Sequence, residues 1–224
     1  MEYKTNYFIQ SYASRTWENY RQLKQIHEED LRFKQCSVFE VTQLINSFFG
    51  ILIVPFEASK PFKDKNKPEN TIKSYRSSLR KMKSADEDAI KKISSLIEKL
   101  NLDHRYYNDY PFDKKNVDLL PILFLERLRN ALSHGGDTGL RFFPTTVSPE
   151  EDDAVSCISS VIFVDKSKDG SFVVELSIDE MESLLELLHT IFTKYQIVDK
   201  LEAGKYNKNI EELRTLMREE SSNM

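Results

Sequence analysis

The stretch at residues 117–136, VDLLPILFLERLRNALSHGG, divides the chain into two parts with different hydrophobic patterns. Its first half is apolar and its second half is basic, and Gly135 and Gly136 predict a left-handed cap that ends a helix at His134. Before this stretch, apolar side chains recur with the spacing of helices. After it they alternate at every second residue, which is the period of β-strands.

Upstream, the periodicity predicts helices over residues 6–33 and 36–54, and the second is apolar on most sides, as a central helix should be. A third helix is predicted to start at Ser84, because Glu87 follows three residues later as in a capping box. Between this helix and the 117–134 helix, residues 101–116 are polar and aromatic, and Pro111 predicts an irregular, ordered loop there.

Downstream, residues 157–164 and 171–179 predict an antiparallel hairpin with a turn at 166–170, to which residues 140–143 can add a third strand. Helical spacing returns over residues 178–195, and a weaker helix is predicted at 210–218. The chain is therefore expected to be mainly α, with a hairpin or three-stranded sheet between the 117–134 helix and the C-terminal helices. We expect one domain over residues 1–204, with a basic loop at 59–83 and the hairpin inserted at 138–178, followed by a helix and tail at 205–224.

The composition excludes several classes of protein. With 224 residues and 40% hydrophobic content, the chain can build one good-sized core. No apolar run reaches the roughly 18 residues that cross a bilayer, and the N-terminus has no secretory pattern, so we expect a cytoplasmic protein with no membrane contact. Two cysteines predict neither a disulfide framework nor a zinc site. Neither GxxxxGK[ST] nor GxGxxG occurs, which argues against P-loop and Rossmann nucleotide binding, and we expect no cofactor and no bound metal.

Charge is distributed unevenly along the chain. Residues 59–83 hold nine basic and two acidic side chains, a local charge of +7, so the remainder of this chain of net charge −4 carries −11. Two interpretations stay open for this segment: a solvated, charged linker, or a surface that contacts a phosphate backbone.

The candidate site lies at the end of the 117–134 helix. On 3.6 residues per turn, Arg127 lies roughly 20° and Asn130 roughly 40° from His134, so the three share one face of the helix. Leu125, Leu128 and Leu132 form a core-facing seam on another flank. His134 lies at the negative end of the helix dipole, and an imidazole is the side chain best suited to act as an acid or base near neutral pH. An arginine beside it can bind a phosphate.

These residue types are the parts of a metal-free ribonuclease, in which the 2′-hydroxyl attacks the adjacent phosphate under acid–base catalysis. One histidine can hardly deprotonate the nucleophile and protonate the leaving oxygen at once, so a two-fold homodimer would supply the second. The alternative from the residues alone is that His134 only caps its helix and that Arg129 is an ordinary salt-bridged surface residue.

The pattern Arg129-Asn130-x-x-x-His134 resembles the Arg-polar-x-x-x-His signature of the HEPN superfamily, small helical domains that include many metal-independent endoribonucleases. Residues 39–55 and the ending RNALSHG at 129–135 resemble a plasmid-type HEPN nuclease family, which also has a short hairpin and a helix afterwards. The resemblance covers residues 39–195, with gaps.

The resemblance implies a toxin or phage-defence endoribonuclease that acts on RNA as a homodimer, possessing an antitoxin or defence partner. It implies that Arg129 binds the phosphate, that Asn130 is the polar residue of the motif and that His134 is the acid or base. On an ideal helix Arg129 points roughly 140° away from His134, whereas Arg127 lies nearer, so helix geometry and the family pattern favour different arginines. The choice between them stays open here, with Arg127 retained as a substrate-binding candidate.

Arg105, Tyr106 and Tyr107 are further substrate-binding candidates, because tyrosines beside an arginine can stack unpaired bases. His27, on a solvated helix end, and His189, packed in the late helix, are expected to be structural. Two other functions remain open: a non-catalytic HEPN-like module that binds a nucleotide, nucleic acid or protein, and a dimeric scaffold in which the motif is a remnant.

Overall fold

The computed structural model describes residues 8–29, 38–53, 87–134, 137–147 and 155–194. The predicted basic loop at 59–83, the cap at Ser84, the cap at Gly135 and Gly136, and the helix at 210–218 lie outside these residues. The elements, in chain order, are α1 (Phe8–Glu29), α2 (Val38–Phe48), a π-helical segment (Phe49–Ile53), α5 (Glu87–Leu102), β1 (Tyr106–Asn108), α6 (Pro111–Lys115), a 3₁₀ turn (Val117–Leu119), α7 (Leu120–Ser133), β2 (Gly139–Val147), β3 (Val155–Ser167), β4 (Gly170–Ser177) and α8 (Ile178–Lys194).

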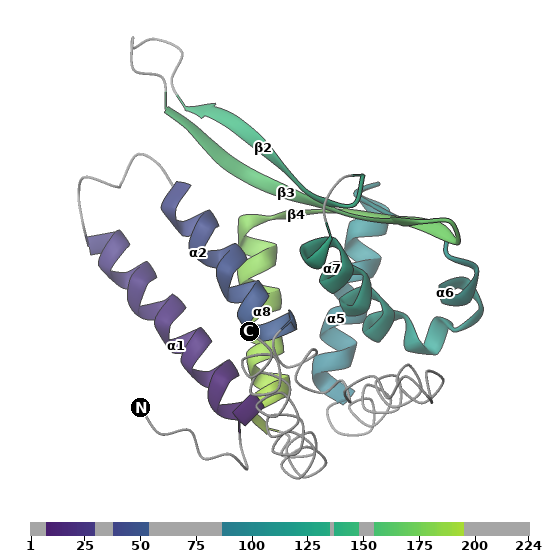
Figure 1. The fold of residues 1–224 in the computed structure, drawn as a ribbon, viewed down its shortest axis with the longest axis horizontal. Helices are drawn as coiled ribbons and strands as arrows, with labels where there is room; N and C mark the ends of the chain where they lie inside the picture. Colours follow the sequence, from purple (N-terminus) through teal and green to yellow (C-terminus); the bar gives the residue numbers. More distant parts are fainter. Residues whose placement is uncertain (1–7, 30–37, 54–86, 135–136, 148–154, 195–224) are drawn as a thin grey trace, which may run out of the picture.

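A four-stranded antiparallel sheet of order β1-β4-β3-β2 lies on one side of a layer of helices (Figure 1). Its helix-facing residues follow the expected period of two. Val161 and Phe163 of β3 pair with Leu176 and Val174 of β4, and all four side chains are fully buried. The core therefore forms between this face of the sheet and α2, α5, α7 and α8.

Both N-terminal helices pack against α8, and α2 also contacts β3 of the sheet. α1 contacts α8 and α2, and the π-helical segment after α2 turns Ile51 and Leu52 into the core. Gly50 allows α1 to come close, because a Cβ at this position would stand 2.8 Å from Cγ2 of Thr16. The prediction that this second helix is central is confirmed, and its last turn is wound more widely than an α-helix.

α7 is buried along one side and packs on β3 and the π-helical segment. Leu125, Leu128 and Leu132 are buried as the seam predicts, and the helix ends at Ser133 with His134 as the first extended residue (φ −114°, ψ 157°). The predicted end of the helix at His134 is confirmed.

The prediction of an irregular loop at residues 101–116 is wrong. Tyr106–Asn108 forms the edge strand β1, which pairs with Phe172–Val174 of β4, and Pro111 begins the short helix α6. Three residues are too few to show strand periodicity, and the hydrogen bonds that make them a strand come from β4, about 65 residues later. Proline is favoured at the first position of a helix, so Pro111 marks a start instead of a break. The sheet thus has one strand more than predicted.

Capping hydrogen bonds fix the end of α5, just before β1, and the start of α8. His104 has a positive φ of 58° and closes α5 with bonds from its own N–H to Asn101 and from the N–H of Arg105 to Leu100 (3.1 and 2.9 Å), the pattern of a Schellman cap. Ser177 and Glu180 form a reciprocal capping box at the start of α8.

In the described ranges, no helix is both long enough and apolar enough to span a bilayer.

Candidate functional site

A buried polar cluster is built around Arg127 of α7. Its Nε and Nη2 donate to the two carboxylate oxygens of Asp113, both at 3.0 Å, and its Nη1 donates to Oδ2 of Asp165 at 3.2 Å. The side chain of Asp113 is fully buried, while the side chains of Asp165 and Arg127 are 7% and 12% exposed. Burial by itself lowers the pKa of Arg127, but its bonds to the two carboxylates outweigh this effect and raise the pKa above its usual value.

Neighbouring side chains complete this buried cluster. The guanidinium carbon of Arg127 lies 3.3 Å from the centroid of the Tyr110 ring, a cation–π contact. One guanidinium faces two carboxylates, so one negative charge is left to be satisfied by other donors. Asn108 donates to Asp113 at 3.0 Å, and Asn130 donates to Asp165 at 3.1 Å. Each buried carboxylate therefore receives an amide hydrogen bond in addition to arginine.

Asn130 connects this cluster to the predicted motif. While its Nδ2 donates to Asp165, its Oδ1 accepts a 2.9 Å hydrogen bond from Nη1 of Arg129. Arg129 is also held through its backbone, because its carbonyl accepts from the hydroxyl of Ser133 at 2.9 Å. A continuous path of hydrogen bonds thus runs from Asp113 through Arg127, Asp165 and Asn130 to Arg129.

His134 is solvent-exposed at the C-terminal end of α7. Its backbone N–H donates to the carbonyl of Asn130 at 3.1 Å, which closes the last turn. Because the side chain leaves from an extended residue just after the helix, it can reach a ligand in solvent without disturbing the packing of α7.

The structure separates the two arginines that the sequence left as alternatives. Arg127 has its Nε, Nη1 and Nη2 atoms engaged by Asp113 and Asp165 in the interior, so its role in the fold is to join α7 to α6 and β3. Arg129 is half-buried and bonds to Asn130. The three residues predicted to share one helical face therefore have different surroundings. Arg127 and Asn130 both bond to Asp165, whereas His134 lies in solvent beyond the helix end.

The substrate-binding candidates near β1 also have different surroundings. Arg105 bonds to Glu180 at 2.8 and 2.9 Å and to Asp103 at 2.8 Å; the bond to Glu180 is the largest of the effects that raise the pKa of Arg105. The Tyr106 ring packs edge-on against Phe172 at 5.7 Å in the core. Tyr107, by contrast, is 55% exposed.

A pocket of about 320 Å³ opens at the edge of β1, with Tyr106, Tyr107 and Lys114 among its lining residues. It also borders Val117 and Leu120, at the start of α7. Since α7 has 14 residues and a helix rises 1.5 Å per residue, this pocket and His134 lie about 20 Å apart along the helix. The structure therefore does not bring the tyrosines and the motif into one site.

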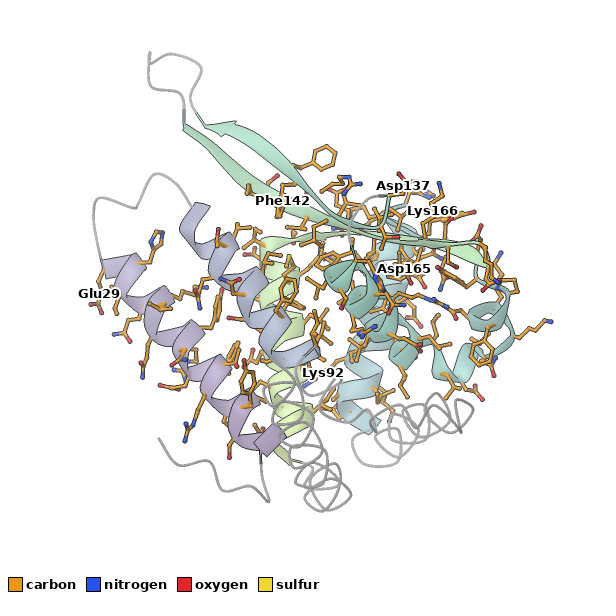
Figure 2. All side chains as sticks on the ribbon, viewed as in Figure 1. Glu29, Lys92, Asp137, Phe142, Asp165 and Lys166 are labelled. Carbon is orange, nitrogen blue, oxygen red and sulfur yellow. The ribbon has the colours of Figure 1, made fainter. Side chains whose placement is uncertain are left out.

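Sequence reasoning missed Asp113 and Asp165. Figure 2 shows Asp165 on the helix-facing side of the sheet and Lys166 on the opposite side. A signal for Asp165 was present, because it continues the inward series of Val161 and Phe163, and a carboxylate at an inward position of a strand needs a buried partner. Asp113 carried no comparable signal, since its segment has no clear period.

The histidines outside the motif are placed as follows. His189 stacks on Trp17 with 5.5 Å between ring centroids, and burial lowers its pKa. His27 is buried, so the prediction that it lies on a solvated helix end is wrong. Within the described ranges, His, Cys, Asp and Glu side chains do not gather in any group of three that could hold a metal ion.

A family model described as HEPN pEK499 p136 matches residues 1–199, which includes every element of the structure. Searches of curated proteins and of solved structures found no match.

Proposed function

This chain belongs to the HEPN pEK499 p136 family, and from that premise we propose that it is a metal-independent endoribonuclease with a composite site formed by two copies of the chain. The observation that carries the proposal is the end of α7. There the motif residues Arg129 and Asn130 are bonded to each other in the last turn, and His134 follows as an exposed residue at the point where the helix stops.

In the proposed reaction, the 2′-oxygen of a ribose forms a bond to the adjacent phosphorus while the bond from phosphorus to the 5′-oxygen of the next nucleotide breaks. One His134 takes the proton of the 2′-hydroxyl, and a second His134 gives a proton to the leaving 5′-oxygen. Arg129 binds the phosphate as its negative charge grows. The products are a 2′,3′-cyclic phosphate and a 5′-hydroxyl.

Two histidines are needed at each cleavage, and the motif provides one per chain. A two-fold homodimer that brings two α7 C-termini together supplies both, because an isologous interface pairs the same surface with itself. On the basis of its family, we further propose that the protein is a toxin or phage-defence effector that acts on RNA in the cytoplasm. An antitoxin or defence partner would restrain or trigger it. The +7 charge of residues 59–83 suits contact with RNA phosphates.

A second function is favoured by one observation. Arg127, Asn130 and Arg129 are engaged in hydrogen bonds within the chain, as expected if the polar groups of the motif stabilise the fold. In that case the chain is a non-catalytic HEPN-like module that binds a nucleotide, nucleic acid or partner protein.

The deciding experiment is incubation of the purified protein with a mixed RNA pool in EDTA, followed by analysis of the cleaved ends. We expect the wild type to leave cyclic phosphates, and His134→Ala to lower the rate by about 10²–10⁴-fold, the usual contribution of an acid–base group. His104→Asn is the matched control, because His104 is another exposed histidine and asparagine tolerates its positive φ.

Cleavage by His134→Ala at the wild-type rate would remove His134 from the mechanism. If the wild type cleaves nothing, with or without added divalent metal, binding to a 2′-O-methyl RNA oligonucleotide is measured by fluorescence anisotropy. Binding without cleavage then supports the second function. Sedimentation velocity tests the dimer, because a protein that cleaves at full rate as a monomer contradicts the composite site.

A further inference from the structure

We propose that Asp165 of β3 is a positioning residue of the site, which sets the Arg129 guanidinium through Asn130. This inference rests on the proposed ribonuclease function for its catalytic consequence, while the positioning itself is a property of the fold. The path has two bonds, from Asn130 Nδ2 to Asp165 Oδ2 at 3.1 Å and from Arg129 Nη1 to Asn130 Oδ1 at 2.9 Å.

The charge of Asp165 decides which way the Asn130 amide points. A carboxylate accepts hydrogen bonds and donates none, so it selects the NH₂ end of Asn130 and leaves the carbonyl end for Arg129. In the reversed orientation, the amide oxygen would face the carboxylate and the amide hydrogens would face a guanidinium, so both contacts would be repulsive. Asp165 therefore fixes an acceptor for Arg129 through Asn130.

Asp165 is itself held from several directions. It is buried on the inward face of β3, and its Oδ2 also accepts from Nη1 of Arg127. The backbone carbonyl of Asp165 accepts a long hydrogen bond of 3.4 Å from the hydroxyl of Tyr110. A carboxylate fixed on a strand by this many contacts provides a rigid reference for the last turn of α7.

The two carboxylates that contact Arg127 provide a matched pair for the test. Asp113 and Asp165 both bond to Arg127, but the bond to Asn130 is made by Asp165. A role limited to stabilising Arg127 predicts similar effects of Asp113→Asn and Asp165→Asn. A positioning role predicts that only substitutions of Asp165 slow the reaction.

We expect Asp165→Ala to lower kcat about 10–100-fold and to change KM less than about threefold, the range seen when residues that orient a reacting group are removed. Asp165→Asn should show a smaller loss, because its amide oxygen can still accept from Asn130. Asp113→Asn should keep kcat within about threefold of wild type. All rates are measured at a temperature where circular dichroism shows every variant folded.

Coupling between Asp165 and Asn130 separates positioning from independent effects. If Asp165 acts through Asn130, the double variant Asp165→Ala/Asn130→Ala cleaves no more slowly than Asn130→Ala alone. Multiplication of the two single losses would overturn the inference, and so would an equal loss of kcat in Asp113→Asn and Asp165→Asn.

A second measurement does not depend on cleavage. Arginine side-chain NMR reports rotation about the Nε–Cζ bond, which we expect to be more restricted for Arg129 in the wild type and in Asp113→Asn than in Asp165→Ala. Arg129 signals that are unchanged in Asp165→Ala would overturn the positioning role, whether or not the protein cleaves RNA. Loss of restriction in a protein that cleaves no RNA would retain the positioning role and reject the proposed function.

Discussion

Replacement of Asp113 by alanine tests the energetics of the buried cluster most directly. Asp113 is fully buried and accepts three hydrogen bonds of 3.0 Å, two from Arg127 and one from Asn108. Asp113→Ala leaves an arginine that is 12% exposed with two donors unpaired, in a space that the alanine side chain cannot fill.

The expected loss follows from these contacts. Removal of one partner from a buried ion pair costs about 3–5 kcal/mol, because the remaining charge is left without its counter-charge. Arg127 keeps Asp165 at 3.2 Å and the ring of Tyr110 at 3.3 Å, so we expect the lower end, about 3 kcal/mol. With a typical stability of about 5–15 kcal/mol, the variant should fold but unfold at a distinctly lower urea concentration.

Urea unfolding followed by circular dichroism gives the free energy of unfolding. An unchanged m-value would show that the variant and the wild type expose the same amount of surface on unfolding. Asp118→Ala is the control, because Asp118 is an exposed aspartate that lies shortly after Asp113 in the sequence. Its replacement should change the free energy of unfolding by less than about 0.5 kcal/mol. A double-mutant cycle with Arg127→Met should show coupling, since the double variant no longer contains the unpaired guanidinium. A loss below about 1 kcal/mol for Asp113→Ala, or additive effects in the cycle, would refute this account.

Two further predictions concern the connections around β1. The bond to Arg105 lowers the pKa of Glu180 to about 2 from 4.5, so its stabilisation is complete above about pH 4.5 and is lost as the pH falls toward 2. Glu180→Gln should therefore lower the free energy of unfolding by about 1–2 kcal/mol at pH 7, a loss that solvent keeps small because the Arg105 side chain is 25% exposed. In urea titrations, the difference from wild type should shrink as the pH falls from 4.5 to 2. A difference that does not depend on pH would contradict the assignment. His104→Gly should raise the melting temperature by about 1–2 °C, because glycine adopts the φ of 58° without strain. Asn101→Gly, inside α5, should lower it, and a fall in both variants would show that strain at His104 is not relieved.

The sequence predicted α7 well because every signal along it agrees. Its leucine seam, its length and the glycines after His134 point to the same helix, and a helix is stabilised by bonds between residues close in sequence. The inward alternation of β4 was equally clear, since one face of that strand is buried and the other is not. β1 was missed because a three-residue strand exists only through its pairing with β4.

The candidate site was likewise predicted in part from local sequence and in part depends on distant segments. The motif residues Arg129, Asn130 and His134 could be selected from their spacing and from the family resemblance. The ideal helix correctly placed Arg127 and Asn130 on one side but could not reveal what lies opposite them. Their partners Asp113 and Asp165 lie 14 and 38 residues from Arg127, one before it and one after it.

The sequence by itself determined the long helices, the β3–β4 hairpin, the end of α7 at His134 and the motif carried there, because these depend on local periodicity and on residue order. Only the tertiary structure decided which arginine is committed to the interior, that the tyrosine segment supplies an edge strand, and that Asp165 lies against Asn130. Those outcomes depend on where distant segments meet, and a buried charge takes the partner that packing places within hydrogen-bonding distance.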